Sequence, residues 1–392
     1  MNYILFDGNV RNALLPFTYT RPVADIRVGI LTIREKWEKI LGLTTTTITE
    51  EYLEEKYPMV EMEENVLINS SFLPNKELVE KVKGLSQNQA IFYGEEVVAF
   101  YTVETQEEVD FSSYDQIDFE GELLQVKNTW DIFSLNDKAI QFDFELITEG
   151  RKSQPIPEGV QYINKENIFI EEGAEILFST LNASKGPIYI GKDSKIMESS
   201  SIRGPFALCE NAIVKMGAKI YGASTFGPNC KVGGEVNNSV LFANSNKGHE
   251  GYLGNSVLGE WCNLGADTNT SNLKNNYAEV KIWNYETGRF AKTGLQFCGL
   301  MMGDHSKCGI NTMFNTGTVI GVSANLFGSG FPRNYVPSFS WGGASGFTTY
   351  QLRKVFEVAE VVMKRRGLEF TETESKILEA IFEETNQYRN YQ

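Results

Sequence analysis

An apolar residue recurs at every sixth position between residues 190 and 232. An α-helix repeats about every 3.6 residues and a strand about every 2, so neither explains this spacing. The hexapeptide β-helix does explain it, because six residues form one short strand with its turn, and the aliphatic residue points into the interior. We therefore predict a left-handed parallel β-helix with inward-facing Ile190, Ile196, Ile202, Leu208, Val214, Ile220, Phe226 and Val232.

The register of this repeat fails after Val232, because the next sixth-residue positions are Asn238 and Asn244. Functional residues tend to lie where a regular pattern breaks. We therefore expect the chemistry of the chain just after residue 232. The repeat returns farther along as Leu258 and Leu264, and then as Met302, Cys308, Phe314, Ile320 and Leu326.

Composition limits the classes of protein to which the chain can belong. Its 392 residues allow two or three domains, and 42% hydrophobic residues can bury a sizeable core. A net charge of −15 argues against binding to nucleic acid or anionic membranes, since the overall field repels polyanions. Residues 1–7 lack the basic start and apolar run of a signal peptide, and no apolar stretch could span a bilayer. We therefore expect a cytoplasmic protein.

All five cysteines lie in the repeat half of the chain and form no Cys-x-x-Cys pair. Cys308 occupies an inward repeat position, and Cys230 and Cys262 occupy small-residue positions. We therefore expect buried structural thiols, without disulfides or zinc.

The amino-terminal part reads as an α/β domain. Residues 3–6 predict a strand, residues 7–9 a polar turn, and residues 30–41 one apolar face of a helix that stops at Gly42. A loop between a first strand and a helix is the usual place for binding a phosphate, because loop amides and helix N-termini attract anions. Residues 66–69 predict another strand, and residues 90–101 predict a hairpin around Gly94.

The first loop resembles the signature of sugar-1-phosphate nucleotidyltransferases, in which a glycine-rich loop precedes a Pro-Lys pair. The resemblance implies that Gly8, Arg11 and Arg21 bind the nucleotide. The chain departs from the family in having one glycine in this loop and Val23 where the lysine is expected. Asn69 stands where the family carries a magnesium-binding aspartate, and an amide is a poorer ligand for Mg²⁺ than a carboxylate. A nucleotidyltransferase-like domain without transfer activity is therefore the alternative interpretation.

The Pro-rich segment 155–159 is the strongest boundary signal. The predicted fold is an α/β nucleotidyltransferase-like domain (1–155), a left-handed parallel β-helix of hexapeptide repeats (156–346) and C-terminal helices (347–392). The last helix follows a capping box formed by Thr371 and Glu374. We expect these helices to cap the open end of the prism or to clasp a neighbouring chain.

His249 and His305 are the only histidines in the chain. Transfer of an acyl group from a thioester needs a base to accept a proton from the attacking amine or hydroxyl, and histidine suits this role. His249 lies in a glycine-flanked segment at the break in the repeat, which favours it as the base. His305 follows a repeat turn, and we expect it to be an exposed turn residue.

The segments Gly248-His249, Tyr252-Leu253-Gly254 and Asn263-Leu264-Gly265-Ala266, with Asn272 beyond, resemble one known family. This is the bifunctional UDP-N-acetylglucosamine diphosphorylase and glucosamine-1-phosphate N-acetyltransferase (GlmU-like) family, in particular its bacterial branch with a shortened amino-terminal domain. The resemblance implies that His249 is the general base and that Gly265 and Ala266 approach acetyl-CoA. It also implies that the sugar phosphate is contacted by Tyr252, Asn263 and Asn272.

The chain departs from this family where Asp267 replaces a glycine and Leu273 replaces a tyrosine. The family's lysine upstream of the histidine is not evident. A sugar phosphate also needs cations, for which the candidates are Lys247, Arg203, Lys219 and Lys281.

The resemblance implies acetyl transfer from acetyl-CoA to glucosamine 1-phosphate, followed by transfer of a nucleotide from UTP, with Mg²⁺, to form UDP-N-acetylglucosamine. It also implies a homotrimer with active sites between neighbouring prisms. Three alternatives remain open. The chain could acetylate another sugar nucleotide and carry a degenerate first domain, it could be a nucleotidyltransferase whose β-helix serves only oligomerisation, or it could be a binding or regulatory protein.

Overall fold

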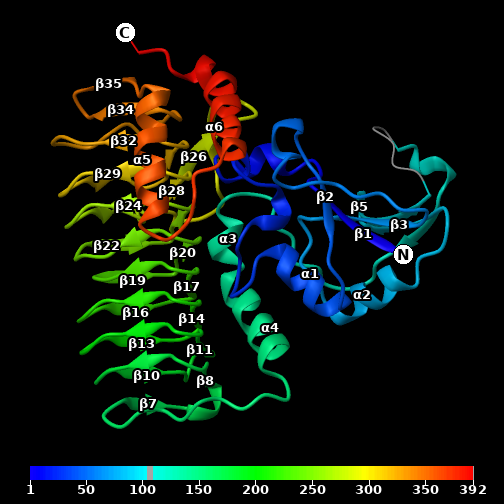
Figure 1. Ribbon diagram of the computed structural model, residues 1–392, viewed down its shortest axis with the longest axis horizontal. Coiled ribbons are helices and arrows are strands. Elements are labelled where there is room, and N and C mark those ends of the chain that lie inside the picture. The colour runs from blue at the N-terminus through cyan, green and yellow to red at the C-terminus, as the bar shows by residue number, and fades with distance from the viewer. Residues whose placement is uncertain (104–108, 392) are drawn as a thin grey trace.

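The structure, a computed structural model, describes residues 1–103 and 109–391 and shows an α/β domain beside a long β-helix (Figure 1). The α/β domain is built on one six-stranded sheet in the order β2-β1-β3-β5-β4-β6. β1 pairs in parallel with β2 and β3, whereas β5 is antiparallel to both β3 and β4. The strands are β1 (Asn2–Phe6), β2 (Thr46–Ile48), β3 (Asn65–Asn69), β4 (Gln89–Tyr93), β5 (Glu96–Thr102) and β6 (Asp115–Asp118).

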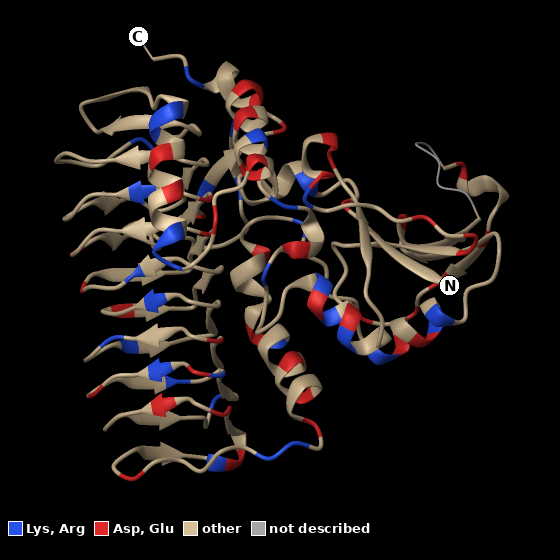
Figure 2. Cartoon of the chain, viewed as in Figure 1, with Lys and Arg blue, Asp and Glu red and all other residues tan. Residues whose placement is uncertain are grey.

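The predicted elements of this domain are confirmed. The helix α1 (Ile33–Leu41) begins at a capping box of Thr32 and Glu35 and ends at Gly42, whose φ of +74° suits a residue without a side chain. β4 and β5 form the predicted hairpin around Gly94. Acidic and basic residues are interspersed along α1 and α2 (Figure 2). The other helices of the domain are α2 (Lys76–Lys83), α3 (Asp131–Ser134) and α4 (Asn136–Thr148), with 3₁₀ turns at Arg11–Leu14, Phe17–Tyr19, Val23–Asp25, Glu51–Leu53 and Phe111–Ser113.

The β-helix has three parallel sheets, which confirms the fold class expected from the repeat. The first sheet contains β7 (Gln161–Ile163), β10 (Thr180–Asn182), β13 (Ser201–Arg203), β16 (Lys219–Tyr221), β19 (Glu235–Asn237) and β22 (Tyr252–Gly254). The second contains β8 (Ile168–Ile170), β11 (Ile188–Ile190), β14 (Phe206–Leu208), β17 (Ser224–Phe226), β20 (Val240–Leu241), β23 (Val257–Leu258), β28 (Leu300–Met302), β31 (Thr318–Ile320) and β33 (Tyr335–Val336).

The third sheet ends in a hairpin, because β35 runs antiparallel to β34. A 3₁₀ turn, Lys165–Asn167, precedes β8. The third sheet contains β9 (Glu175–Ile176), β12 (Lys195–Ile196), β15 (Ile213–Val214), β18 (Lys231–Val232), β21 (Asn246–Lys247), β24 (Asn263–Leu264), β29 (Lys307–Cys308), β32 (Asn325–Leu326), β34 (Ser340–Gly343) and β35 (Gly346–Thr349).

The predicted inward-facing residues form the core of the β-helix. The eight residues from Ile190 to Val232 are each at most 2% exposed, and the later run from Met302 to Leu326 is at most 5% exposed. All five cysteines are buried, as expected. The repeat therefore identified the interior correctly.

The break in the six-residue spacing after Val232 is not a break in the fold. The coils continue, but some turns are shorter, so the inward positions become Val236 and Leu241 instead of Asn238. Asn238 and Asn244 adopt left-handed φ values of 45° and 61° at the turns. Asparagine tolerates this conformation better than most residues, so it can occupy a shortened turn.

A true insertion lies between β24 and β28. It carries β25 (Asn269–Thr270), which pairs with β30 (Met313–Phe314), and an antiparallel hairpin of β26 (Lys281–Asn284) and β27 (Arg289–Lys292). The gap in the sequence repeat between residues 264 and 302 corresponds to this insertion.

The α/β domain packs against the outer face of the second sheet. Phe17 and Phe242 bring their ring centroids within 5.4 Å across this contact. Asn136 of α4 donates its Nδ2 to the Ala223 carbonyl at 2.8 Å. One hydrophobic cluster therefore contains buried residues from both parts of the chain.

One of our two expectations was that the C-terminal helices cap the open end of the prism. This expectation is wrong. α5 (Leu352–Lys364) runs back along the β-helix, and α6 (Glu372–Glu384) packs beside the α/β domain (Figure 1). Ile377, Leu378 and Ile381 of α6 are buried in the cluster shared with that domain. The capping box at Thr371 is confirmed, and a 3₁₀ turn, Thr385–Tyr388, follows the helix. Within the described residues, no helix is both long and apolar enough to cross a membrane.

Candidate acyl-transfer site

His249 lies at the corner where the chain turns from β21 into β22. It is exposed and borders a shallow cleft of about 360 Å³. Glycines occupy two of its corners, Gly233 and Gly248, where the preceding coils carry Met197 and Lys215. Its lining residues are Met197, Lys215, Met216, Gly233, Gly234, Gly248, His249 and Glu250.

Lys247 occupies an inward position of the third sheet, in register with Val232. Only 2% of the residue is exposed, and its ammonium donates to the carbonyl of His249. Burial lowers the pKa of Lys247 to about 8, although the nearby Glu250 and Asp267 carboxylates raise it. The sequence predicted a cation that contacts substrate, whereas the structure places this amine beneath the His249 turn.

Replacing Lys247 with methionine should not destabilise the protein at about pH 7. The folded pKa lies below the ordinary value of 10.5, so the unfolded chain holds the proton more tightly than the folded one. The buried charge therefore costs stability below about pH 8, and this cost disappears as the pH rises to about 10.5. We expect Lys247→Met to be more stable by up to about 3 kcal/mol at neutral pH, with the gap closing at high pH. Urea unfolding across this range tests this, and a variant less stable than wild type at neutral pH contradicts it.

Gly248 interrupts a ladder of backbone hydrogen bonds along the same corner. Gly233, Gly265 and Gly309 each donate their N–H to the carbonyl of the coil above, at 2.8, 3.0 and 2.8 Å. Among the described residues, the N–H of Gly248 has no such partner. A Cβ at Gly248 would also meet only one atom within 4 Å, so this peptide borders open space beside His249. The N–H groups of this ladder point toward the following coil, so the Gly248 amide faces residues 264–265, where it can donate to an oxygen of a reacting carbonyl.

Tyr252 and Asn272, both expected to contact the sugar phosphate, lie together. Asn272 Nδ2 lies 3.0 Å from the Tyr252 hydroxyl and 2.8 Å from Asn255 Oδ1. Asn263 lies apart from this pair, because it faces outward on the third sheet, where its Oδ1 is 3.5 Å from Asn246 Nδ2. The structure thus brings Tyr252 and Asn272 together beyond the His249 turn and leaves Asn263 on another face.

Gly265 and Ala266 occupy the corner one coil beyond Gly248 and His249. The two corners are joined by a 3.0 Å hydrogen bond from the Asp267 N–H to the Glu250 carbonyl. Asp267, which departs from the expected glycine, adopts a left-handed φ of 58°. Aspartate tolerates this conformation, so the corner keeps the shape that a glycine would give it.

The remaining candidate cations lie on other surfaces. Arg203 and Lys219 line a groove of about 450 Å³ on the outer face of the first sheet. Lys219 also forms an ion pair with Glu250 at 3.6 Å, which links that groove to the His249 turn. Lys281 lies in the inserted hairpin.

In the α/β domain, Arg11 is engaged by its own chain. Its guanidinium pairs with Asp7 at 2.9 Å and with Glu50 at 3.1 Å, and it also donates to the Thr18 carbonyl and the Tyr52 hydroxyl. The residue is 8% exposed. These contacts hold the first loop in place and leave Arg11 little capacity for a nucleotide.

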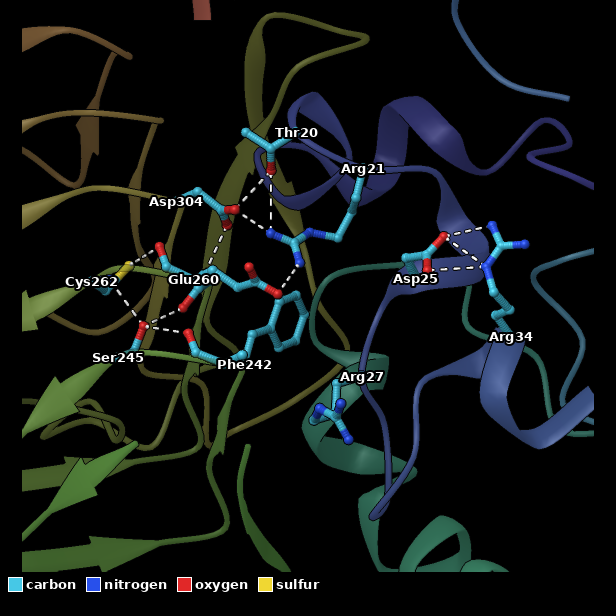
Figure 3. Close-up of polar contacts among 12 residues, drawn as sticks. Thr20, Arg21, Asp25, Arg27, Arg34, Phe242, Ser245, Glu260, Cys262 and Asp304 are labelled. Carbon is cyan, nitrogen blue, oxygen red and sulfur yellow. Dashed lines mark hydrogen bonds and ion pairs between the residues drawn. The ribbon is translucent and has the colours of Figure 1, made fainter. Parts of the chain in front are cut away.

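Arg21 points away from the first loop and into the β-helix (Figure 3). Its guanidinium pairs with Glu260 at 2.8 Å and with Asp304. The Thr20 hydroxyl donates to the same Asp304 carboxylate at 2.9 Å. Burial would lower the pKa of Arg21, but the two carboxylates raise it, so the guanidinium stays charged. Arg21 therefore joins the two parts of the chain.

Gly8 and Asn69 meet at the carboxyl ends of β1 and β3. A Cβ at Gly8 would lie 2.9 Å from Asn69 Oδ1. The Asn69 amide donates to the Val97 carbonyl at 3.1 Å and accepts from the Ser71 N–H and hydroxyl. Within the described part of the chain, no three His, Cys, Asp or Glu side chains could together hold a metal. Asn69 is therefore already engaged within the chain and supplies no carboxylate for Mg²⁺.

His305 is not the exposed turn residue that we expected. It is partly buried, its ring stacks on Trp261 at 6.1 Å, and its Nδ1 has no hydrogen-bond partner. Burial lowers the pKa of His305 well below its ordinary value, with a further contribution from Lys307. The side chain lies beneath α5 and α6.

Residues 3–152 match the family model described as sugar nucleotidyl transferase. The bifunctional sugar-1-phosphate nucleotidylyltransferase/acetyltransferase of Sulfurisphaera tokodaii is 30% identical over 211 residues, which cover 54% of this chain and 46% of that protein. Two proteins named bifunctional protein GlmU are also similar. That of Methanocaldococcus jannaschii is 36% identical over 22% of this chain and 21% of its own length, and that of Synechococcus elongatus is 24% identical over 52% and 46%.

This chain thus spans about half the length, or less, of the curated relatives that it matches. The predicted resemblance to GlmU-like proteins is nevertheless confirmed. The sequence did not predict the inward placement of Lys247 or the ion pairs of Arg21 with Glu260 and Asp304. A shift of the interior position after the shortened turn would have placed Lys247, but no local signal predicts the partners of Arg21.

Proposed function

From the resemblance of this chain to GlmU-like transferases, we propose that it transfers the acetyl group of acetyl-CoA to the amine of an amino-sugar 1-phosphate, with glucosamine 1-phosphate as the expected acceptor. The observation that carries the proposal is the corner at residues 247–251. An exposed histidine and a backbone amide without a partner lie together there, beside a cleft. These are the two groups that acyl transfer from a thioester requires.

In the proposed reaction, the neutral amine of the sugar attacks the carbonyl carbon of the thioester. The C–N bond forms while His249 accepts the proton that the nitrogen loses. The carbonyl oxygen becomes negative in the intermediate, and the Gly248 N–H donates to it. The C–S bond then breaks, and the thiolate of CoA receives the proton from His249.

The sugar is placed on the first-sheet side of the His249 turn. Tyr252 and Asn272 offer a hydroxyl and an amide there, and Lys219 lies close enough to pair with Glu250. Hydrogen-bonding side chains of this kind suit the hydroxyls of a sugar ring. Gly265 and Ala266 line the adjoining corner, where a lack of large side chains would let the acetyl end of CoA approach.

We also propose that the α/β domain transfers a nucleotide from UTP to the acetylated sugar 1-phosphate. The family match over residues 3–152 supports this second activity. Arg11, Arg21 and Asn69 are each engaged within the chain, so they supply no argument for it. We take residues 1–155, 156–346 and 347–392 as the domains, a cytoplasmic location, and a homotrimer in which neighbouring prisms complete the sites.

Two assays separate the proposal from its alternatives. Acetyl-CoA is offered with a panel of amino sugars, their 1-phosphates and sugar nucleotides, and we expect the fastest thioester loss with glucosamine 1-phosphate. Faster thioester loss with a sugar nucleotide that offers only a hydroxyl would instead favour the alternative in which the chain acetylates another sugar nucleotide. For the α/β domain, pyrophosphate release from UTP and N-acetylglucosamine 1-phosphate is measured with saturating Mg²⁺. We expect release, and its absence would overturn the bifunctional proposal while leaving acetyl transfer intact.

A further inference from the structure

Four basic side chains gather where the end of α5 meets the outer face of the third sheet. We call Lys215, Lys231, Arg365 and Arg366 the cationic row. Lys231 lies on β18, Lys215 follows β15, and Arg366 Nη2 donates to Asn246 Oδ1 of β21 at 3.1 Å. In Figure 2, basic residues at the lower end of α5 lie over strands of the β-helix that also carry basic residues.

No carboxylate neutralises this row in the described part of the chain. None of its four members forms an ion pair, although the chain carries 51 acidic and only 36 basic residues. Burial lowers the pKa of Lys231, and the positive charges of Arg366, Lys215 and Arg365 lower it further. Like charges held this close repel one another, so the arrangement costs energy unless an anion shares it.

The row leads to the candidate active site. Lys215 lines the cleft that His249 borders, and a Cβ at Gly233, another lining residue, would lie 3.0 Å from the Lys215 Cβ. Asn246, which accepts from Arg366, directly precedes Lys247 beneath the His249 turn. A molecule that extends along the row can therefore reach the cleft at Lys215.

We propose that the cationic row binds a phosphate group of a substrate whose reacting end enters the His249 cleft. The proposal rests on the proposed function, because that function makes the cleft a reaction site. Lysine ammonium and arginine guanidinium groups bind phosphate oxygens through charge-assisted hydrogen bonds, and the two arginines offer paired donors. The phosphate could come from the nucleotide end of CoA or from the sugar 1-phosphate, and these sources differ in the rest of the molecule.

The test is a calorimetric titration of the full chain with inorganic phosphate, adenosine 3′,5′-bisphosphate and glucosamine 1-phosphate. Lys231→Gln and Arg366→Gln remove one charge each. Lys195→Gln is the matched control, because Lys195 aligns with Ile213 and Ile213 with Lys231 on the same outer face, but its charge is already paired with Glu175 at 2.6 Å.

We expect the first two variants to bind phosphate about tenfold more weakly, and the control to bind as the wild type does. The organic phosphate that binds more tightly than inorganic phosphate identifies the source. Equal affinities in all variants, or no binding to the wild type, would refute phosphate binding by the cationic row, even if acetyl transfer occurs. Weakened phosphate binding in the two row variants, without any acetyl transfer by the wild type, would support phosphate binding by the cationic row and refute the proposed function.

Discussion

Replacing His249 with alanine should lower the rate of acetyl transfer by about a hundredfold to ten-thousandfold, the range typical for loss of a general base. The side chain is exposed and has no hydrogen-bond partner among the described residues, so its removal should leave the fold intact. Loss of thioester is followed with acetyl-CoA and glucosamine 1-phosphate at saturating concentrations of both. We expect the loss in kcat, with an unchanged thermal unfolding temperature.

The matched control is His305→Asn, which replaces the only other histidine. Asparagine accepts the left-handed φ of 61° at this turn, and His305 lies outside the cleft. We expect near wild-type acetyl transfer from this variant. Full activity in His249→Ala, or equal losses in both variants, would refute the role of His249 as the base.

Arg21→Ala should destabilise the protein by about 3–5 kcal/mol, because it leaves buried carboxylates without their counter-charge. The side chains of Arg21 and Asp304 are only 6% and 4% exposed, and Glu260 contributes a second carboxylate. All three lie between the α/β domain and the β-helix. Chemical denaturation followed by circular dichroism should therefore show the loss, with the α/β domain separating from the β-helix.

Two further variants test the cause of this loss. Lys138→Ala removes an exposed ion pair with Glu122 and should leave the stability close to that of the wild type. Adding Asp304→Asn to Arg21→Ala removes one of the uncompensated charges and should recover part of the stability. An Arg21→Ala protein as stable as the wild type would show that the pair does not hold the two parts together.

The β-helix could be predicted because its interior follows a strict rule. Each coil stacks on the next in register, so one inward residue in every six must be small enough and apolar enough to fit. Ile190 to Val232 obey this rule and are buried. The rule does not predict shortened turns, because a turn can lose a residue while the strands stay in register. Lys247 was therefore not recognised as an interior residue.

Contacts between the two parts of the chain could not be predicted. Arg21 pairs with Asp304 across 283 residues, and Lys36 pairs with Asp143 of α4, with both side chains fully buried. A charged residue in a loop carries no local signal of such a partner. The resemblance to nucleotidyltransferases suggested nucleotide binding for Arg21, whereas packing of the α/β domain on the β-helix assigns it a different contact.

The most direct test of the proposed function is the product formed by the purified chain from acetyl-CoA and glucosamine 1-phosphate. Mass spectrometry with ¹³C-labelled acetyl-CoA shows where the label goes, and a thiol reagent counts the CoA released. We predict one labelled acetyl group on the sugar nitrogen for each thiol, with formation slowed at least about a hundredfold in His249→Ala. Label on a hydroxyl, or no labelled sugar with the wild-type chain, would contradict acetyl transfer to the amine.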